Sequence, residues 1–553
     1  MRLIERRIGL LFAVFLGMLA LAGLRAGWLG VVKADTLRKA AATQQTAHVK
    51  VPARRGAITD RNGIELAVSQ PAMTVAATPY LIKDPVKLAA RLAKPLRTPE
   101  DKLLRQLTRR DTGFAYLARR VPAVRARRVE RMEIEGLELI PEARRTYPRN
   151  FLASQLLGNV GSEGRGLSGL EYSLDGLLRG RDGERRLVKD ALGEAIELRE
   201  TKRTKPGSQV TLTVDEAIQD KAEEVLAEVG ETWRPRGATA IVMDPRDGAL
   251  LALANWPRVD ANNPGDAPDY ARQNRAVGAT YEPGSTFKPF TVAGALEERE
   301  VTPETSFHLP PTIRLYDREI GESHPRGAVT LNTREILEQS SNVGAIKIGL
   351  GLGAKRFDQW VRRFGFGKPT GTDLPGEEAG IVLPLAKYSG ASMGNLPIGQ
   401  GLAVTPMQMA VAYSAIANGG VLRPAHIVER VDGRQARPHK GRRIISEANA
   451  ASVRKMLEGV LGPGGTATGA AIKGYELAGK TGTAEKPDPV TGGYSKDKYV
   501  ASFVGFAPAR HPKLLVTVMV DEPQGEIYGG LVAGPAFKQI TSFALNYLRI
   551  PPG

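Results

Sequence analysis

The chain of 553 residues contains no cysteine, and this absence excludes thiol catalysis and metal sites with sulfur ligands. It also fits an oxidising compartment, where stray thiols are a liability. Histidine is scarce, and no pair has metal-ligand spacing among the six residues at positions 48, 308, 324, 426, 439 and 511. We therefore expect no metal and no cofactor. A catalytic triad would have to recruit an isolated histidine, so lysine-based catalysis is the simpler hypothesis.

Aromatic residues are also few, at 6% of the chain, whereas the formal net charge is +18. The positive charge is unevenly distributed along the chain. Residues 1–34 hold 5 basic and 1 acidic residues, about +4, and residues 35–210 hold 34 basic and 21 acidic residues, about +13. Residues 211–553 hold 38 basic and 37 acidic residues, about +1. Basic clusters such as 125–128 have two open interpretations, an anionic partner or a solvated arginine-rich surface. Because aromatic residues are sparse, we expect no nucleic-acid partner.

Long apolar runs are absent except near the N-terminus. Residues 8–24 are uncharged and mostly apolar, and a snorkelling Arg25 lets the run extend to Val32, which is long enough to cross a bilayer. Three arginines within the first seven residues precede it, so the positive-inside rule predicts a cytoplasmic N-terminus and an extracytoplasmic remainder. A cleaved signal peptide is the alternative, because residues 19–22 are small enough for a peptidase. The length of the run favours a retained anchor.

Three short motifs in the C-terminal half supply the groups of a serine acyltransferase that works without histidine. The first runs from Ser285 to Lys288, and a helix that opens after Gly284 would put both side chains on one face. A neutral lysine can then accept the serine proton, if burial and a neighbouring cation such as Lys480 lower its pKa. The backbone N–H of Ser285 is a candidate oxyanion donor. A capped helix start without catalytic function is the alternative.

The other two motifs supply a proton route and a binding strand. Ser340-Ser341-Asn342 is expected on a loop after a helix over 333–339, where the Ser340 hydroxyl can relay a proton and Asn342 can hold a substrate amide. Lys480-Thr481-Gly482-Thr483 indicates an edge strand with Thr481 and Thr483 on one face, suited to a carboxylate beside a cation. Gly482 removes a side chain where a ligand would lie against the backbone.

A rival motif overlaps the third one. Residues 474–481 match the phosphate-binding pattern G-x-x-x-x-G-K-[ST], which would indicate a nucleotide hydrolase. That loop must be followed by a helix, whereas Gly482, Pro487, Pro489 and the glycine pair at 492–493 disfavour a sustained helix here. The context therefore argues against a nucleotide site.

The three motifs, in this order and at these separations, resemble those of the penicillin-binding proteins. The Arg-Gly-x-Ile-x-Asp-Arg-x-Gly box at 55–63, with 144–148 and 169–172, is similar to the pedestal of the class B members. Nothing ahead of residue 211 resembles a glycosyltransferase, so the bifunctional class A members fit badly. Residues 281–284 and Asn342 are similar to the division-type enzymes, because the elongation-type relatives typically have aspartate at the asparagine position.

The resemblance implies an α+β fold: a single transmembrane helix, an elongated β-rich pedestal, and a β-lactamase-like penicilloyl-serine transferase domain whose central antiparallel sheet is flanked by helices. We predict boundaries at 1–34 for tail and anchor, 35–210 for the pedestal and 211–553 for the catalytic domain, with turn chemistry at 205–208. Periodicity and turn residues predict a hairpin over 51–70, helices over 83–110, 122–135, 215–229 and 540–548, and strands over 209–214, 238–244, 249–254, 499–507 and 514–521.

The resemblance also implies a reaction, D,D-transpeptidation of peptidoglycan stem peptides on lipid-linked strands during septal wall synthesis. Ser285 would attack the penultimate D-alanine carbonyl with Lys288 as base, and Ser340 and Lys480 would carry the proton to the leaving amine. Thr481 and Thr483 would hold the terminal carboxylate, and the Thr483 N–H would be the second oxyanion donor. β-Lactams would acylate the same serine.

The resemblance implies an inner-membrane location and, as partners, an FtsW-type glycan polymerase and other division proteins. Four alternatives stay open: an elongation-type transpeptidase, a membrane-anchored β-lactamase, a membrane-anchored β-lactam sensor, and a division scaffold without enzymatic function. The acceptor amine and the oligomeric state are also open.

Overall fold

The computed structural model describes residues 2–34, 46–109, 112–189, 195–316, 318–437, 439–488 and 492–552. The chain divides into two compact units, one of residues 1–54 with 180–207 and one of residues 55–179 with 208–553. This division runs through the predicted pedestal, because residues 55–179 join the second unit whereas residues 180–207 belong to the first. The two units are described separately below.

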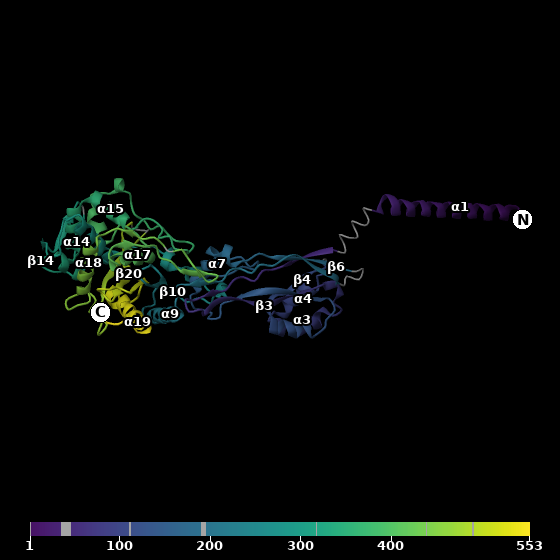
Figure 1. The fold of residues 1–553 in the computed structure, drawn as a ribbon, viewed down its shortest axis with the longest axis horizontal. Coiled ribbons are helices and arrows are strands. Elements are labelled where there is room, and N and C mark those ends of the chain that lie inside the picture. Colours follow the sequence, from purple (N-terminus) through teal and green to yellow (C-terminus); the bar gives the residue numbers. More distant parts are fainter. Residues whose placement is uncertain are drawn as a thin grey trace. The chain divides into compact units, whose positions relative to one another are not determined.

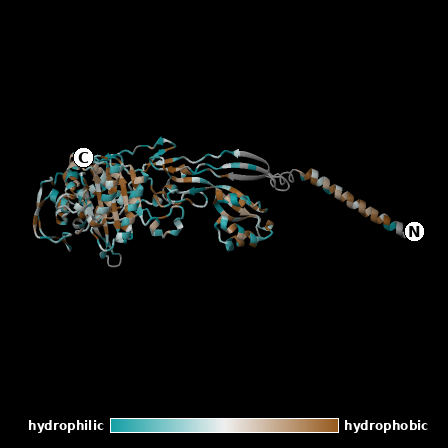
Figure 2. Cartoon of the chain, turned by 90° about the horizontal axis from the view of Figure 1, so that it is seen from below, coloured by the Kyte–Doolittle hydropathy of each residue, from teal (hydrophilic) through white to brown (hydrophobic). Residues whose placement is uncertain are grey.

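The first unit contains the predicted apolar helix. Helix α1 (Arg2–Gly27) continues into a π-helical turn, η1 (Trp28–Val32). Figure 2 shows hydrophobic residues along most of α1. Among the described residues, Arg6–Val32 is the one helical stretch long and apolar enough to cross a membrane. The unit also holds a three-stranded antiparallel sheet in the order β1-β6-β7, made of Thr46–Val51, Gly183–Lys189 and Ala195–Lys202.

The second unit begins with the predicted hairpin. Strands β2 (Ile58–Thr59) and β3 (Glu65–Ala77) pair antiparallel. Asp60 holds the turn between them, since its Oδ1 accepts hydrogen bonds from the backbone N–H of Asn62 and of Ile64, each at 2.8 Å. The long β3 also pairs with β4 (Ala115–Pro122) and β5 (Leu137–Thr146).

A small helical cluster packs on this sheet. The predicted helices over 83–110 and 122–135 are confirmed as three shorter ones, α3 (Pro85–Leu96), α4 (Glu100–Leu107) and α5 (Ala123–Glu130). The leucines of α3 and α4 recur at helical spacing and are buried together, which closes a separate core around residues 88, 92, 96, 103 and 107.

The central antiparallel sheet has the strand order β10-β9-β21-β20-β19. The strands predicted over 238–244, 249–254, 499–507 and 514–521 are confirmed. In the sheet order, the bounds are Leu250–Trp256, Gly237–Met243, Leu514–Asp521, Tyr494–Ala507 and Ala478–Pro487. Strand β19 therefore lies at one edge. Strands from the beginning and the end of the segment meet in this sheet, because β9 pairs with both β10 and β21.

Helices cover both faces of the sheet. Helices α9 (Glu216–Trp233) and α19 (Gly529–Tyr547) contact each other and the sheet, whereas α17 (Pro406–Ala417) contacts α18 (Glu447–Gly459) and β21. Figure 1 shows α17 and α19 on opposite sides of β20. The C-terminal helix begins eleven residues before the predicted start, at Gly529, because tertiary packing overrides the local effect of its glycines and of Pro535.

The remaining elements are short or surround the cleft described below. In the pedestal segment and the following loop they are Pro79–Leu81, Ser154–Leu157, Gly169–Ser173, Asp175–Leu178, Val210–Leu212, Pro264–Asp266, Asp269–Arg272 and Arg275–Gly278. Later in the chain they are Gly284–Phe287, Lys288–Glu297, Ser306–Leu309, Thr312–Leu315, Arg318–Gly321, Val329–Asn332, Thr333–Glu338, Asn342–Leu352, Ala354–Arg363, Leu385–Lys387, Ser392–Asn395, Leu396–Ile398, Val421–Leu422, Val428–Val431, Arg434–Gln435, Arg442–Arg443 and Thr468–Ala470.

Candidate active site

The first motif lies at a helix start, as predicted. Ser285 is on a 3-10 turn, η4 (Gly284–Phe287), and Lys288 is the first residue of α12 (Lys288–Glu297). Gly284 has φ of +53°, and a Cβ there would lie 3.2 Å from the Thr483 carbonyl oxygen. Phe287 is fully buried against other aromatic rings, which fixes the turn from below. The turn is thus pressed against β19.

The Lys288 side chain is completely buried and held by the second motif. Its Nζ donates to the Ser340 carbonyl oxygen at 2.6 Å, to Asn342 Oδ1 at 2.7 Å and to Ser340 Oγ at 3.3 Å. Burial lowers the pKa of Lys288 to about 7, and the charge of Glu322 opposes that shift. The pKa of Lys480 is lowered well below its usual value, by burial and by the charge of Lys288. Both lysines therefore lie in the dry, locally basic environment that the sequence predicts.

The second motif differs from the prediction in one respect. Ser340 follows α13 (Thr333–Glu338) with φ of +60°, whereas Asn342 is the first residue of α14 (Asn342–Leu352) and not part of a loop. The reason is the Ser341 side chain, whose Oγ accepts from the Gly344 N–H at 3.0 Å and caps the helix. The helix start fixes the Asn342 side chain toward Lys288.

Glu322 is a buried carboxylate that sequence reasoning missed. It follows the hairpin of β12 (Thr312–Leu315) and β13 (Arg318–Gly321), and its side chain is 6% exposed. Glu322 accepts from the Ser341 hydroxyl at 2.6 Å and from the Asn342 N–H at 2.5 Å, and it pairs with Arg326 at 2.5 Å. It belongs to no motif and lies twenty residues before the group that it holds, so no pattern in the sequence reveals it.

The third motif forms the predicted edge strand. Lys480 is fully buried, and its Nζ donates to the carbonyl oxygen and to Oγ1 of Thr481, each at 3.3 Å. The Thr481 hydroxyl also lies 3.0 Å from that of Thr466. Thr483 Oγ1 accepts from the Gly529 N–H at 3.0 Å, which ties β19 to the start of α19.

Gly482 was expected to leave space for a ligand, but protein atoms surround it instead. A Cβ at this position would lie 2.5 Å from Ser502 Oγ and 2.9 Å from the Pro283 carbonyl oxygen. The space is therefore filled by β20 and by the chain just before the nucleophile turn, and not left for a ligand. Glycine is required here because β19 and η4 approach each other closely.

The three motifs meet in one cleft of about 1260 Å³. Five of the predicted site residues line it, namely Ser285, Ser340, Asn342, Thr481 and Thr483. Lys288 and Lys480 are fully buried behind the lining. Gly482 does not line the cleft, and close packing accounts for a glycine at this position.

The structure contradicts the phosphate-binding alternative. Residues 478–487 form one continuous strand, so no helix follows Thr481 to present its N-terminus to a phosphate. Among the described residues, no group of three or more histidine, aspartate or glutamate side chains is arranged to hold a metal ion.

Ser285 thus comes one helical turn before a buried lysine of lowered pKa, and it lines the same cleft as the two threonines of an edge strand. Residues 238–542 match the penicillin-binding protein transpeptidase domain, and residues 50–212 match the penicillin-binding protein dimerisation domain. The chain belongs to the class B penicillin-binding proteins, which confirms the predicted family.

Two curated relatives and one solved structure illustrate the similarity. The chain is 34% identical to the peptidoglycan D,D-transpeptidase FtsI of Escherichia coli, over 98% of this chain and 92% of that protein. It is also 34% identical to the probable peptidoglycan D,D-transpeptidase PenA of Neisseria meningitidis, over 91% and 86%. The crystal structure of penicillin-binding protein 3 from Mycobacterium tuberculosis with aztreonam superposes with a TM-score of 0.72, at 28% identity, covering 91% of this chain and 98% of that one.

Proposed function

We propose that this peptidoglycan D,D-transpeptidase cross-links stem peptides during septal wall synthesis through an acyl-enzyme on Ser285. The observation that carries the proposal is the convergence of Ser285, Ser340, Asn342 and Thr481 on one cleft, with Lys288 buried behind them. A D-alanyl-D-alanine stem peptide would enter this cleft, and a β-lactam would enter it as a strained analogue of the same amide.

In this proposal Lys288 is the base that removes the Ser285 proton. Its pKa of about 7 leaves a large neutral fraction at physiological pH, whereas an ordinary lysine is almost fully protonated. Attack on the penultimate D-alanine carbonyl breaks its amide bond, and the terminal D-alanine leaves as an amine after it gains a proton. Ser340, 3.3 Å from Lys288 Nζ, and the buried Lys480 would deliver that proton. An amine from a neighbouring stem peptide would then take the acyl group.

Stabilisation of the oxyanion is assigned to two backbone N–H groups, those of Ser285 and Thr483. Ser285 is in the first turn of a helical segment, where N–H groups lack intrahelical partners. Thr483 is on the edge strand, which pairs with β20 on one side and faces η4 on the other. The hydroxyls of Thr481 and Thr483 would bind the terminal carboxylate of the substrate, beside Lys480.

For the whole chain we propose residues 1–34 as tail and membrane anchor, 35–210 as pedestal and 211–553 as catalytic domain. The N-terminus would lie in the cytoplasm and the rest outside the inner membrane, near an FtsW-type glycan polymerase and other division proteins. The chain has no cysteine, so a single Glu130→Cys variant carries a unique thiol at an exposed position. Labelling of intact cells by an impermeant maleimide supports this orientation, and labelling only after lysis contradicts it.

Penicillin labelling tests the nucleophile. The chain is incubated with a fluorescent penicillin, digested, and the modified peptide is located by mass spectrometry. We expect a stable adduct on Ser285 that Ser285→Ala abolishes, while the matched exposed variant Ser389→Ala keeps it. Rapid loss of the adduct with release of hydrolysed drug would favour a β-lactamase, and label on another residue would overturn the assignment.

Depletion of the chain in its own cells tests the septal role. Filamentous cells would support it, whereas rounded cells would favour an elongation-type transpeptidase. Complementation with Ser285→Ala separates the enzyme from a scaffold, since septation restored by that variant would favour the scaffold.

A further inference from the structure

A second cavity, of about 380 Å³, shares no lining residue with the active-site cleft and is lined by arginines. Arg119 and Arg120 come from β4, Arg125 from α5, and Arg144 and Arg145 from β5. The family's reaction, as derived above, does not use any of these side chains. We call this group the arginine cavity.

The positive charge of the arginine cavity is incompletely balanced. Glu142 lies 2.8 Å from Arg119 and 3.8 Å from Arg120. Glu171 lies 2.5 Å from both Arg145 and Arg55, and Arg55 is also paired with Asp175 at 2.5 Å. Neither carboxylate, nor any other acidic side chain, is among the residues that line the cavity. Glu142 and Glu171 thus offset part of the charge of Arg119, Arg120 and Arg145, whereas Arg125 and Arg144 form no ion pair among the described residues.

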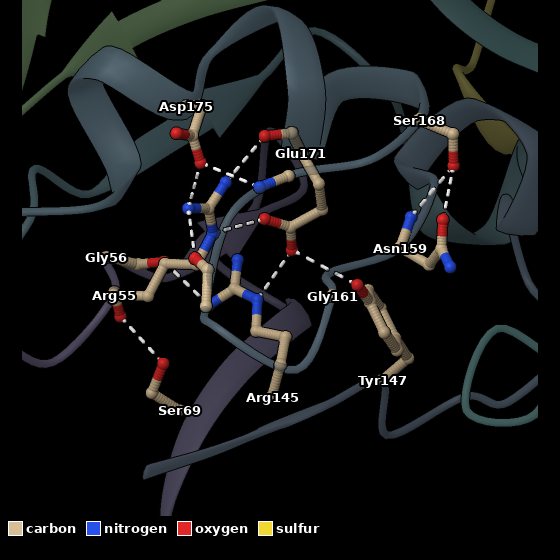
Figure 3. A network of polar contacts seen from close by, with 12 residues as sticks. Arg55, Gly56, Ser69, Arg145, Tyr147, Asn159, Gly161, Ser168, Glu171 and Asp175 are labelled. Carbon is tan, nitrogen blue, oxygen red and sulfur yellow. Dashed lines mark hydrogen bonds and ion pairs between the residues drawn. The ribbon is translucent and has the colours of Figure 1, made fainter.

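One of these groups is buried with a free donor. The Arg145 side chain is only 5% exposed, and its Nε and Nη1 are bonded to Glu171 and to the Gly56 carbonyl oxygen. Its Nη2 is buried without a hydrogen-bond partner, and so is Nη1 of Arg125. Figure 3 shows Arg145 hydrogen-bonded to Glu171, with no dashed line at one of its terminal nitrogens. A buried guanidinium N–H without an acceptor is costly, and a bound anion would satisfy it.

The pKa shifts of two arginines in the cavity also indicate unbalanced positive charge. Burial lowers the pKa of Arg125, and the nearby charges of Arg97 and Arg144 lower it further. Burial also lowers the pKa of Arg120, which Glu142 counteracts. These guanidinium groups repel each other in the absence of an anion, although arginine stays protonated.

We propose that the arginine cavity binds a phosphate-bearing anion, a phosphate monoester or diphosphate group. Guanidinium forks bind phosphate through paired charge-assisted hydrogen bonds, and several arginines around one cavity suit an anion with more than one charge and many acceptor oxygens. A single carboxylate has two oxygens and one charge, so it would leave most of these donors unused.

Binding there would connect two parts of the chain. The cavity is closed on another side by Ala261, Asn262 and Pro264, which follow β10 in the transpeptidase part. Asn262 Nδ2 donates to the Tyr147 carbonyl oxygen at 2.9 Å, and the Tyr147 N–H donates to Asn262 Oδ1 at 3.1 Å. Because the anion binds the folded arrangement alone, it should raise the thermal midpoint of the full chain.

The experiment uses the full chain in detergent and inorganic pyrophosphate as the probe. Calorimetric titration and thermal unfolding are compared for the parent, for Arg125→Gln with Arg144→Gln, and for the control Arg128→Gln. Arg128 is exposed on the same helix and does not line the cavity. We expect binding by the parent and the control, and affinity weaker by about tenfold or more in the double variant. Penicillin labelling of Ser285 should be equal in all three, which shows that each is folded.

No pyrophosphate binding by the parent would overturn the proposal, and so would equal binding by the double variant. A second set of titrations, in nanodiscs, identifies the source of the phosphate group. The lipid is phosphatidylcholine alone or mixed with phosphatidic acid. If the parent binds pyrophosphate more weakly in the mixed discs, and the double variant shows no such difference between the discs, the site is assigned to a lipid headgroup. Equal binding in both discs assigns it to a soluble anion, and either result supports the site.

Discussion

Lys288 connects the buried geometry to a measurable pH dependence. A lysine acts as a base when it is neutral, and the neutral fraction rises as pH passes through the lowered pKa of about 7. We expect the rate constant for acylation of Ser285 by penicillin to fall about tenfold per pH unit well below that value and to level off above it. Stopped-flow acylation between about pH 5.5 and 9 measures the profile. A flat profile across this range would contradict a lysine base.

Glu322 should shift that profile. Its charge raises the pKa of Lys288, so Glu322→Gln lets this pKa fall and moves the midpoint of acylation to lower pH. The plateau rate should also fall, because Glu322 holds Ser341 and the start of α14. Glu304→Gln, which removes an exposed partner of Arg334, is the control and should change neither quantity. If the acylation rate falls but the pH midpoint of acylation does not move, Glu322 has only a structural role.

Of these two residues, Lys288 could be predicted from the sequence and Glu322 could not. Lys288 was predictable because its partner lies one helical turn away in a short motif. Glu322 was not, because its contact with Asn342 depends on how a surface hairpin folds back over a distant helix start. Gly482 shows a third case, in which the residue was identified but its surroundings were not.

At the scale of elements, the contact between β19 and η4 decides whether the site assembles. Gly482→Ala would put a Cβ 2.5 Å from Ser502 Oγ and 2.9 Å from backbone, and overpacking of this kind costs about 1–3 kcal/mol. We expect a lower free energy of unfolding and slower acylation. Gly351→Ala is the control with the opposite sign, since its exposed position in α14 has open space and the helix gains about 0.5–1 kcal/mol. Denaturant titration with penicillin labelling measures both, and a stable, fully active Gly482→Ala would disprove the tight contact.

The elements that the sequence predicted have strong local patterns, whereas helices α17 and α18 and strands β4 and β5 were not predicted. Alternation and turn residues predicted β9, β10, β20 and β21 because each is bounded by strong turn signals. The first half of α19 was missed, since Gly529 is disfavoured in a helix and is present for another reason. A Cβ there would lie 2.2 Å from the Gly482 carbonyl oxygen.

At the scale of the whole molecule, a buried charge network holds the second unit together. Glu171 is fully buried and accepts from Arg55 and Arg145, each at 2.5 Å, while Arg55 also reaches Asp175 at 2.5 Å (Figure 3). These residues come from the start of the unit, from β5, and from helices α7 (Gly169–Ser173) and α8 (Asp175–Leu178). Breaking a buried pair leaves an uncompensated charge, so Glu171→Gln should lower the free energy of unfolding by about 3–5 kcal/mol.

The matched control is Asp101→Asn, which removes an exposed ion pair with Arg105 at 2.8 Å. We expect it to cost less than about 0.5 kcal/mol. Thermal and urea unfolding of both variants provide the comparison. Equal stability of Glu171→Gln and the parent would mean that the arginines find other acceptors.

Strand order was the part of the architecture beyond sequence reasoning. The sheet joins β9 and β10 to strands more than two hundred residues later, and pairings at this separation leave no periodic trace in the sequence. The resemblance to a known family predicted that the three motifs meet in one site. It did not predict that β21 lies between β9 and β20.

That arrangement has a consequence for how the protein is made. Strand β9 finds its inner neighbour only when residues 514–521 have left the ribosome, and α19 comes later still. A chain arrested before residue 514 already carries Ser285, Lys288 and both threonines of β19, yet it cannot assemble its sheet. We therefore expect reactivity toward β-lactams to arise only when almost the last residues have emerged, so nascent fragments should escape the drug.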